Sequence, residues 1–165
     1  MSVNVDNLLT NDVLSGLRNP VLDDARGLPA AIYTSEEFFA AEQESLFPST
    51  WMGIAFDSQV PEAGDAVPLT VLGLPMLLSR DRLGQVHVLH NVCRHRATIV
   101  IEKPCSGQQN FKCPYHGWTY DLDGSLIATP FWDGTPKSER KPVKACDNGL
   151  VKVRSGVWNH IVFVN

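Results

Sequence analysis

Two short segments of the chain each combine one cysteine with one histidine. One residue separates Cys93 from His95, two residues separate Cys113 from His116, and residues 96–112 lie between the two segments. Thiolates and imidazoles are side chains with which proteins bind transition metals. We therefore expect two loops of the fold to bring four metal ligands together, with one thiolate and one imidazole from each loop.

The order of these ligands distinguishes between two kinds of metal centre. Structural zinc sites typically group like ligands, as C-x2–4-C and H-x3–5-H, whereas both motifs here are mixed and the first is tighter than ordinary zinc spacing. In a Rieske [2Fe–2S] centre two cysteines bind one iron and two histidines bind the other. The spacing favours this cluster over zinc. The spacing also argues against a catalytic Cys–His pair. Such a pair needs only one cysteine and one histidine, so the second, similar motif would have no role.

Mixed ligation predicts the chemistry of such a cluster. An imidazole is neutral where a thiolate is anionic, so the cluster carries less negative charge and accepts an electron more easily. Its potential is roughly −150 to +300 mV, against about −400 mV for all-thiolate ferredoxins. The predicted role of the site is therefore electron transfer. The sequence gives no second metal motif, because His87 and His90 are three apart on an expected strand and face opposite sides.

The composition is that of a soluble globular chain. Its 165 residues correspond to one domain, or to one domain with an arm. The formal charge is −4 at pH 7, and without a basic run the sequence gives no case for binding nucleic acid or an anionic membrane. No apolar segment is long enough to span a bilayer, and residues 1–10 lack the features of a signal peptide. We therefore expect a cytoplasmic protein.

The sequence pattern changes near residue 48. Residues 1–48 predict a helical arm, in which Thr34 and Glu37 form a capping box for a helix over 33–47. Residues 49–165 contain short apolar runs separated by turn signals, which is typical of a mainly β domain of small antiparallel sheets. Strands are expected at 51–56, 66–72, 75–80, 85–90, 143–146, 150–153 and 157–164. Both ligand motifs then lie in loops of the β region.

Four other residues bear on the site or on its redox state. Cys105 and Cys146 lie outside the motifs and could pair, but free thiols are the default in a reducing cytosol. Arg94 and Arg96 flank the first ligand pair. Two roles stay open for these arginines: they are solvated loop residues, or they offer positive charge to an acidic redox partner.

The residues around the motifs resemble a known family. Segments 91–96 (Asn-Val-Cys-Arg-His-Arg) and 113–120 (Cys-Pro-Tyr-His-Gly-Trp-Thr-Tyr) are similar to α subunits of Rieske-type aromatic-ring-hydroxylating oxygenases. The similarity extends upstream to 42–51 and downstream to 158–165, and covers roughly residues 28–165. It concerns the N-terminal, Rieske-domain portion of such a subunit.

This resemblance implies a Rieske-like domain of three small antiparallel sheets. It also implies a [2Fe–2S] cluster held by Cys93, His95, Cys113 and His116. Electrons would arrive from a ferredoxin or flavin reductase and pass to a mononuclear Fe(II) in the C-terminal catalytic domain of a neighbouring α subunit in a homotrimer. There O2 would be activated for dihydroxylation, monooxygenation or demethylation. Because that catalytic domain is absent from the 165 residues, we expect this chain alone only to transfer electrons. The alternative is a standalone Rieske ferredoxin.

Two positions depart from related patterns. The family often has Gly after its His–Arg pair, where this chain has Ala97, a residue that some relatives acting on quaternary ammonium compounds share. Respiratory Rieske proteins carry a hydroxyl residue after the loop glycine that hydrogen-bonds the cluster, where this chain has Trp118. Without that donor we expect a potential in the lower part of the Rieske range.

Overall fold

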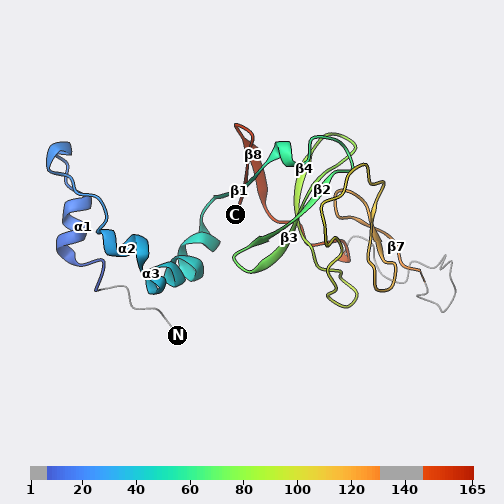
Figure 1. The fold of residues 1–165 in the computed structure, drawn as a ribbon, viewed down its shortest axis with the longest axis horizontal. Coiled ribbons are helices and arrows are strands. Elements are labelled where there is room, and N and C mark those ends of the chain that lie inside the picture. The colour runs from blue at the N-terminus through green and yellow to red at the C-terminus, as the bar shows by residue number, and fades with distance from the viewer. Residues whose placement is uncertain (1–6, 131–146) are drawn as a thin grey trace. The chain divides into compact units, whose positions relative to one another are not determined.

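The computed structural model describes residues 7–130 and 147–165 (Figure 1). The chain forms two compact units, Met1–Thr50 and Trp51–Asn165. Cys146 and the strand expected at 143–146 lie outside the described residues, whereas Cys105 is a free thiol. None of the helices in the described ranges is long and apolar enough to cross a membrane.

The first unit consists of short helices. Helix α1 (Asn11–Leu17) begins at Thr10, whose hydroxyl accepts a hydrogen bond from the Val13 amide. The elements that follow are the 3-10 turn Leu22–Asp24, α2 (Ala30–Thr34), α3 (Glu36–Ala41), the π turn Glu42–Leu46 and the 3-10 turn Phe47–Ser49.

The prediction of one helix over 33–47, capped by Thr34, was wrong in its register. The backbone is extended at Ser35, where ψ is 118°, and the Ser35 hydroxyl accepts a hydrogen bond from the Phe38 amide at 3.1 Å. Thr34 is the last residue of α2, and α3 begins one residue after Ser35. Serine and threonine are both good caps, so two adjacent candidates cannot be ranked from their types alone.

The second unit contains three antiparallel three-stranded sheets, which confirms the predicted fold class. The first sheet has the order β1 (Met52–Phe56), β9 (Ile161–Val164), β8 (Ser155–Trp158). The second has the order β2 (Ala66–Val71), β3 (Leu74–Arg80), β4 (Val86–His90). The third has the order β5 (Phe111–Lys112), β6 (Thr119–Tyr120), β7 (Leu126–Ala128).

Two predicted strands near the C-terminus were wrong. Residues 157–164 form a hairpin instead of one strand, because Asn159 and His160 have φ of 47° and 65° and turn the chain between β8 and β9. Residues 150–153 form no strand, only an isolated bridge between Leu89 and Lys152.

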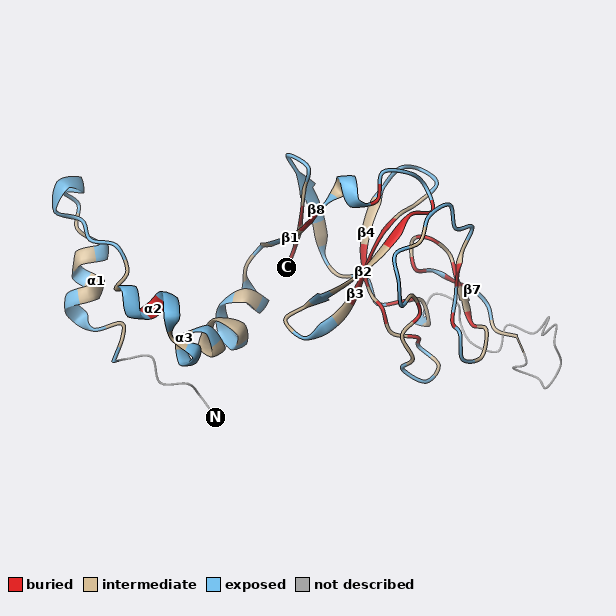
Figure 2. Cartoon of the chain, viewed as in Figure 1, coloured by how far each residue is buried: buried red, intermediate tan, exposed pale blue. Residues whose placement is uncertain are grey.

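The β2–β3–β4 sheet separates two hydrophobic cores. The buried residues of its strands are drawn in red in Figure 2. Leu77 of β3 and Leu89 of β4 belong to the first core, whereas their neighbours Leu78 and Val88 belong to the second. This alternation is the period-2 pattern of a strand that is buried on both faces. The first core also contains the two motif cysteines with Phe111, Trp118 and Tyr120. The predicted ligand loops are therefore anchored in a packed interior.

Candidate metal centre

The first ligand loop is a closed turn that follows β4. The Cys93 amide donates to the Thr98 carbonyl at 2.8 Å, and the Ala97 amide donates back to the Cys93 carbonyl at 2.9 Å. Ala97, the fourth residue after the cysteine, has a left-handed backbone with φ of 55°. Asn91 holds the base of the loop, since its buried side chain accepts from the Ile101 amide at 3.0 Å and donates to the Ile101 carbonyl at 2.7 Å.

The second ligand loop, between β5 and β6, repeats this turn. The Cys113 amide donates to the Trp118 carbonyl at 2.8 Å, and the Gly117 amide donates to the Cys113 carbonyl at 3.0 Å. Gly117 is again the fourth residue after the cysteine, and its φ is 72°. The two loops therefore share one hydrogen-bond pattern, although the histidine stands at the second position after Cys93 and at the third after Cys113.

The four predicted ligands come together as two pairs. Cys93 and Cys113 are each 3% exposed and lie in the same core, and burial together with interaction with Cys93 raises the pKa of Cys113. The imidazoles of His95 and His116 form an edge-to-face pair with centroids 4.7 Å apart. Trp118 joins the two loops, because its ring stacks on His95 at 5.0 Å with an interplanar angle of 9°. The thiol pair is thus interior, and the half-buried imidazole pair lies nearer to solvent.

The pairs have the donor set that a [2Fe–2S] cluster requires. Among the described residues, no group of three His, Cys, Asp or Glu side chains is placed so that it could hold one metal ion. A structural zinc needs four ligands on one ion, whereas a Rieske cluster needs two thiolates on one iron and two imidazoles on the other. The separate thiol and imidazole pairs fit the second demand.

The state of the imidazoles also fits metal binding. His116 Nδ1 is buried and has no hydrogen-bond partner among the described residues, an arrangement that costs free energy unless a ligand satisfies it. Burial lowers the pKa of His95, and the charges of His116 and Arg96 act in the same direction. The ring is therefore neutral at pH 7, which is the form that coordinates metals. Burial raises the pKa of the Cys113 thiol, so metal binding there would release a proton.

Tyr120 is a site residue that reasoning from the sequence missed. Its buried hydroxyl lies 3.2 Å from Cys93 Sγ and accepts a hydrogen bond from the Arg94 amide at 3.0 Å. Burial raises the pKa of Tyr120, so the hydroxyl keeps its proton and can donate it to a Cys93 thiolate. Trp118 occupies the position directly after Gly117, where respiratory Rieske proteins carry their hydroxyl donor, and the hydroxyl of this chain stands two residues later, on β6.

Replacing Tyr120 with phenylalanine should lower the midpoint potential of the cluster by about 40 mV, the equivalent of one hydrogen bond of about 1 kcal/mol in a one-electron couple. The hydroxyl stabilises negative charge on Cys93 Sγ, and that charge is greater in the reduced state. A spectroelectrochemical titration measures the shift. Tyr115→Phe is the control, because this exposed tyrosine makes a ring contact with His116 but no hydroxyl hydrogen bond among the described residues. Equal potentials for wild type and Tyr120→Phe would contradict the assignment.

Replacing Ala97 with glycine should stabilise the protein by about 0.5–1 kcal/mol. A left-handed backbone costs a residue with a Cβ about 1–2 kcal/mol, and the greater unfolded-state entropy of glycine offsets part of the gain. The apparent melting temperature should therefore rise. Ala128→Gly is the opposite control, because glycine weakens a strand such as β7. A lower melting temperature for both variants would contradict this account of Ala97.

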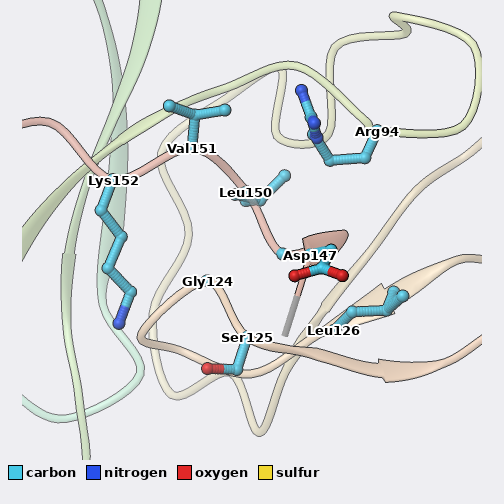
Figure 3. A pocket seen from close by; sticks show the side chains of 9 residues that line it. Arg94, Gly124, Ser125, Leu126, Asp147, Leu150, Val151 and Lys152 are labelled. Atoms are coloured by element: carbon cyan, nitrogen blue, oxygen red, sulfur yellow. The ribbon is translucent and has the colours of Figure 1, made fainter. Parts of the chain in front are cut away.

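Hollows formed by described residues adjoin both ligand loops. One of about 490 Å³ lies beside the first loop and is lined by Arg94, Ser125, Asp147 and Lys152 among others (Figure 3). The others adjoin His95 and His116, respectively. Lys152 Nζ forms an ion pair with the Asp123 carboxylate at 3.0 Å. Burial would raise the pKa of Asp123, but hydrogen bonds from Ser125 and Lys152 lower this pKa to about 2.

The other histidines and arginines take no part in the ligand pairs. His87 Nε2 lies 2.8 Å from the Asp81 carboxylate. Arg94 and Arg96 are exposed, and within the described ranges neither forms an ion pair. Both roles considered for these arginines therefore stay open.

Fold and site together define a two-loop iron–sulfur domain, and comparison with known proteins gives the family. Residues 50–145 match the Rieske [2Fe-2S] domain family. The chain belongs to this family.

Similar proteins are oxygenases. Choline monooxygenase from Atriplex hortensis chloroplasts is 36% identical over 145 residues, or 87% of this chain and 31% of that protein. The biphenyl 2,3-dioxygenase α subunit of Rhodococcus jostii (strain RHA1) is 30% identical over 146 residues, or 88% of this chain and 31% of that protein. A crystal structure of a quaternary ammonium Rieske monooxygenase matches with a TM-score of 0.69 and 26% identity, and covers 83% of this chain and 36% of that chain. The present chain thus spans about a third of the length of these relatives.

Proposed function

We propose that this chain is the electron-relay domain of a Rieske non-haem iron oxygenase. Cys93 and Cys113 would bind one iron of a [2Fe–2S] cluster, and His95 and His116 the other. The observation that carries this proposal is the division of the four side chains into a buried thiol pair and an imidazole pair whose His116 Nδ1 is unpartnered among the described residues. When bound, the cluster would supply one-electron transfer.

The whole protein would be the α subunit of a ring-hydroxylating or demethylating oxygenase. In this proposal residues 1–48 are a lead-in, residues 49–165 form the Rieske domain, and a catalytic domain with mononuclear Fe(II) follows. The length of the relatives supports such a domain. A ferredoxin or flavin reductase would deliver electrons, and the acceptor would be the catalytic domain of a neighbouring subunit in a cytoplasmic homotrimer. Inter-subunit electron transfer in the related quaternary ammonium Rieske monooxygenase supports this route.

The decisive test is an EPR spectrum of the dithionite-reduced protein together with iron, zinc and sulfide analysis. We expect two irons and two acid-labile sulfides for each chain, with the signal of mixed histidine and cysteine ligation. Zinc without labile sulfide would refute the proposal. A signal typical of four cysteine ligands would refute the ligand assignment while leaving an iron–sulfur protein. A native reading frame that ends at Asn165 would favour the standalone ferredoxin, and one that continues into a His-His-carboxylate motif would favour the oxygenase.

A further inference from the structure

The outer face of the β1–β9–β8 sheet is apolar. In β9, Val162 and Val164 are buried in the second core, so Ile161 and Phe163 point to the opposite side of the sheet. The register places six residues on that side, which we call the outer face: Gly53, Phe56, Gly156, Trp158, Ile161 and Phe163.

This outer face carries large exposed side chains and no charge. Trp158 is 71% exposed and Phe56 is 57% exposed. The Trp158 ring reaches Phe163 across the strands, with centroids 6.5 Å apart. A Cβ at Gly156 would meet no atom within 4 Å, so a neighbouring surface could approach the backbone closely there. Exposed aromatic side chains gathered on one face of a sheet are typical of an interaction site.

The position of the outer face argues against a transient redox partner. An electron carrier must approach the ligand loops, whose Cys93 and Cys113 belong to the first core. The sheet that bears the outer face packs on the second core, beyond the β2–β3–β4 layer. Permanent interfaces are also more hydrophobic than those of transient redox encounters. The composition and the place of the outer face both indicate a permanent partner.

The connections of this unit to the rest of a longer chain meet at the same sheet. Met52, at the start of β1, pairs with Val164 near the end of β9, and in Figure 1 the C-terminus lies beside β1. Arg154 joins both ends, because its guanidinium lies 5.1 Å from the centre of the Trp51 ring and donates to the Asn165 side chain at 3.2 Å. A domain attached after Asn165 would therefore begin at the rim of the outer face, and attachment raises its effective concentration there.

We propose that the outer face is the surface on which the Rieske unit packs against the catalytic domain of its own chain. The proposal rests on the proposed function, because it requires such a domain in the full-length protein. The length of the relatives, of which this chain covers 31%, supplies an occupant of sufficient size.

The test places a charge on the outer face in two proteins, the full-length protein and the 165-residue chain. A Cβ at Gly156 would meet no atom within 4 Å, and the residue is exposed, so Gly156→Arg should leave the melting temperature and the visible spectrum of the 165-residue chain unchanged. In the full-length protein the arginine would be buried against an apolar surface, and the melting temperature should fall by on the order of 5 °C. Leu83→Arg is the matched control, because Leu83 is 92% exposed in the turn between β3 and β4 and should affect neither protein.

Several outcomes would overturn the proposal. Equal effects of Gly156→Arg on the two proteins would do so, as would a full-length protein with no C-terminal domain. A dimer of the 165-residue chain that Gly156→Arg dissociates would assign the outer face to a second copy. Equal hydroxyl-radical modification of Trp158 in both proteins would show that the C-terminal domain does not cover this face. EPR and metal analysis test the cluster, whereas the melting temperatures and the modification of Trp158 test the outer face. A wrong cluster assignment can therefore be distinguished from a wrong interface.

Discussion

Replacing Cys113 with serine should abolish assembly of the iron–sulfur cluster. The Cys113 side chain is 3% exposed and faces Cys93 within the first core. A serine hydroxyl fills nearly the same space, but it does not ionise near neutral pH and is a poor ligand for iron. The visible absorption and the EPR signal should therefore be lost. The protein should also unfold at a lower temperature, because a cluster bound only to the folded state stabilises it.

Cys105 provides a matched control for this experiment. It is also a free cysteine with a half-buried side chain, but it lies outside both motifs. Its backbone pairs with Ala66 at the start of β2, through hydrogen bonds of 2.8 and 2.9 Å, so it stands outside both ligand loops and should stay uncoordinated. Cys105→Ser should keep the full absorption spectrum, whereas His116→Ala should lose it as Cys113→Ser does. Retention of the spectrum in Cys113→Ser would rule out the thiol pair as the iron ligands.

The fold class could be predicted from the sequence, and the four candidate ligands could be proposed from it, because both signals are local. Cys93 and His95 have a spacing that restricts the metal they can hold, and the short apolar runs after residue 50 are each long enough for one strand. The shared turn of the two loops could not be read in this way. This turn depends on the left-handed backbone of Ala97. The sequence shows only that an alanine stands where the family often has glycine, and it does not show the conformation.

The wrong predictions concern features that tertiary contacts determine. Residues 157–164 are apolar enough for one strand, but His160 accepts a hydrogen bond from the Asp57 amide at 3.0 Å and its ring lies 3.3 Å from the Asp57 carboxylate. These contacts, 103 residues apart in sequence, hold the turn of the hairpin. Tyr120 was missed for a similar reason, because its role depends on a contact with Cys93 in the other loop.

Replacing Gly64 with alanine should be the most destabilising single change outside the candidate centre. Gly64 has a φ of +88°, and a Cβ there would clash with the Gln108 carbonyl oxygen and lie 2.6 Å from the Gln108 nitrogen. The Gln108 amide donates to the Gly64 carbonyl at 3.0 Å, and the Gly64 amide donates to the Arg80 carbonyl at 3.0 Å. This contact therefore attaches the segment between the two ligand motifs to the end of β3. We expect a loss of about 3–4 kcal/mol, the sum of left-handed strain and a clash between backbones.

Gly73→Ala separates the two parts of that loss. Gly73 has a φ of +77°, but a Cβ there would meet no atom within 4 Å. Its substitution should cost only the strain of a left-handed alanine, about 1–2 kcal/mol. Urea unfolding followed by tryptophan fluorescence gives both free energies, and visible absorption reports whether the cluster is retained. Equal losses in the two variants would mean that backbone strain alone limits residue 64. A larger loss for Gly64→Ala, accompanied by loss of the cluster, would show that the Gly64–Gln108 contact holds the ligand loops in place.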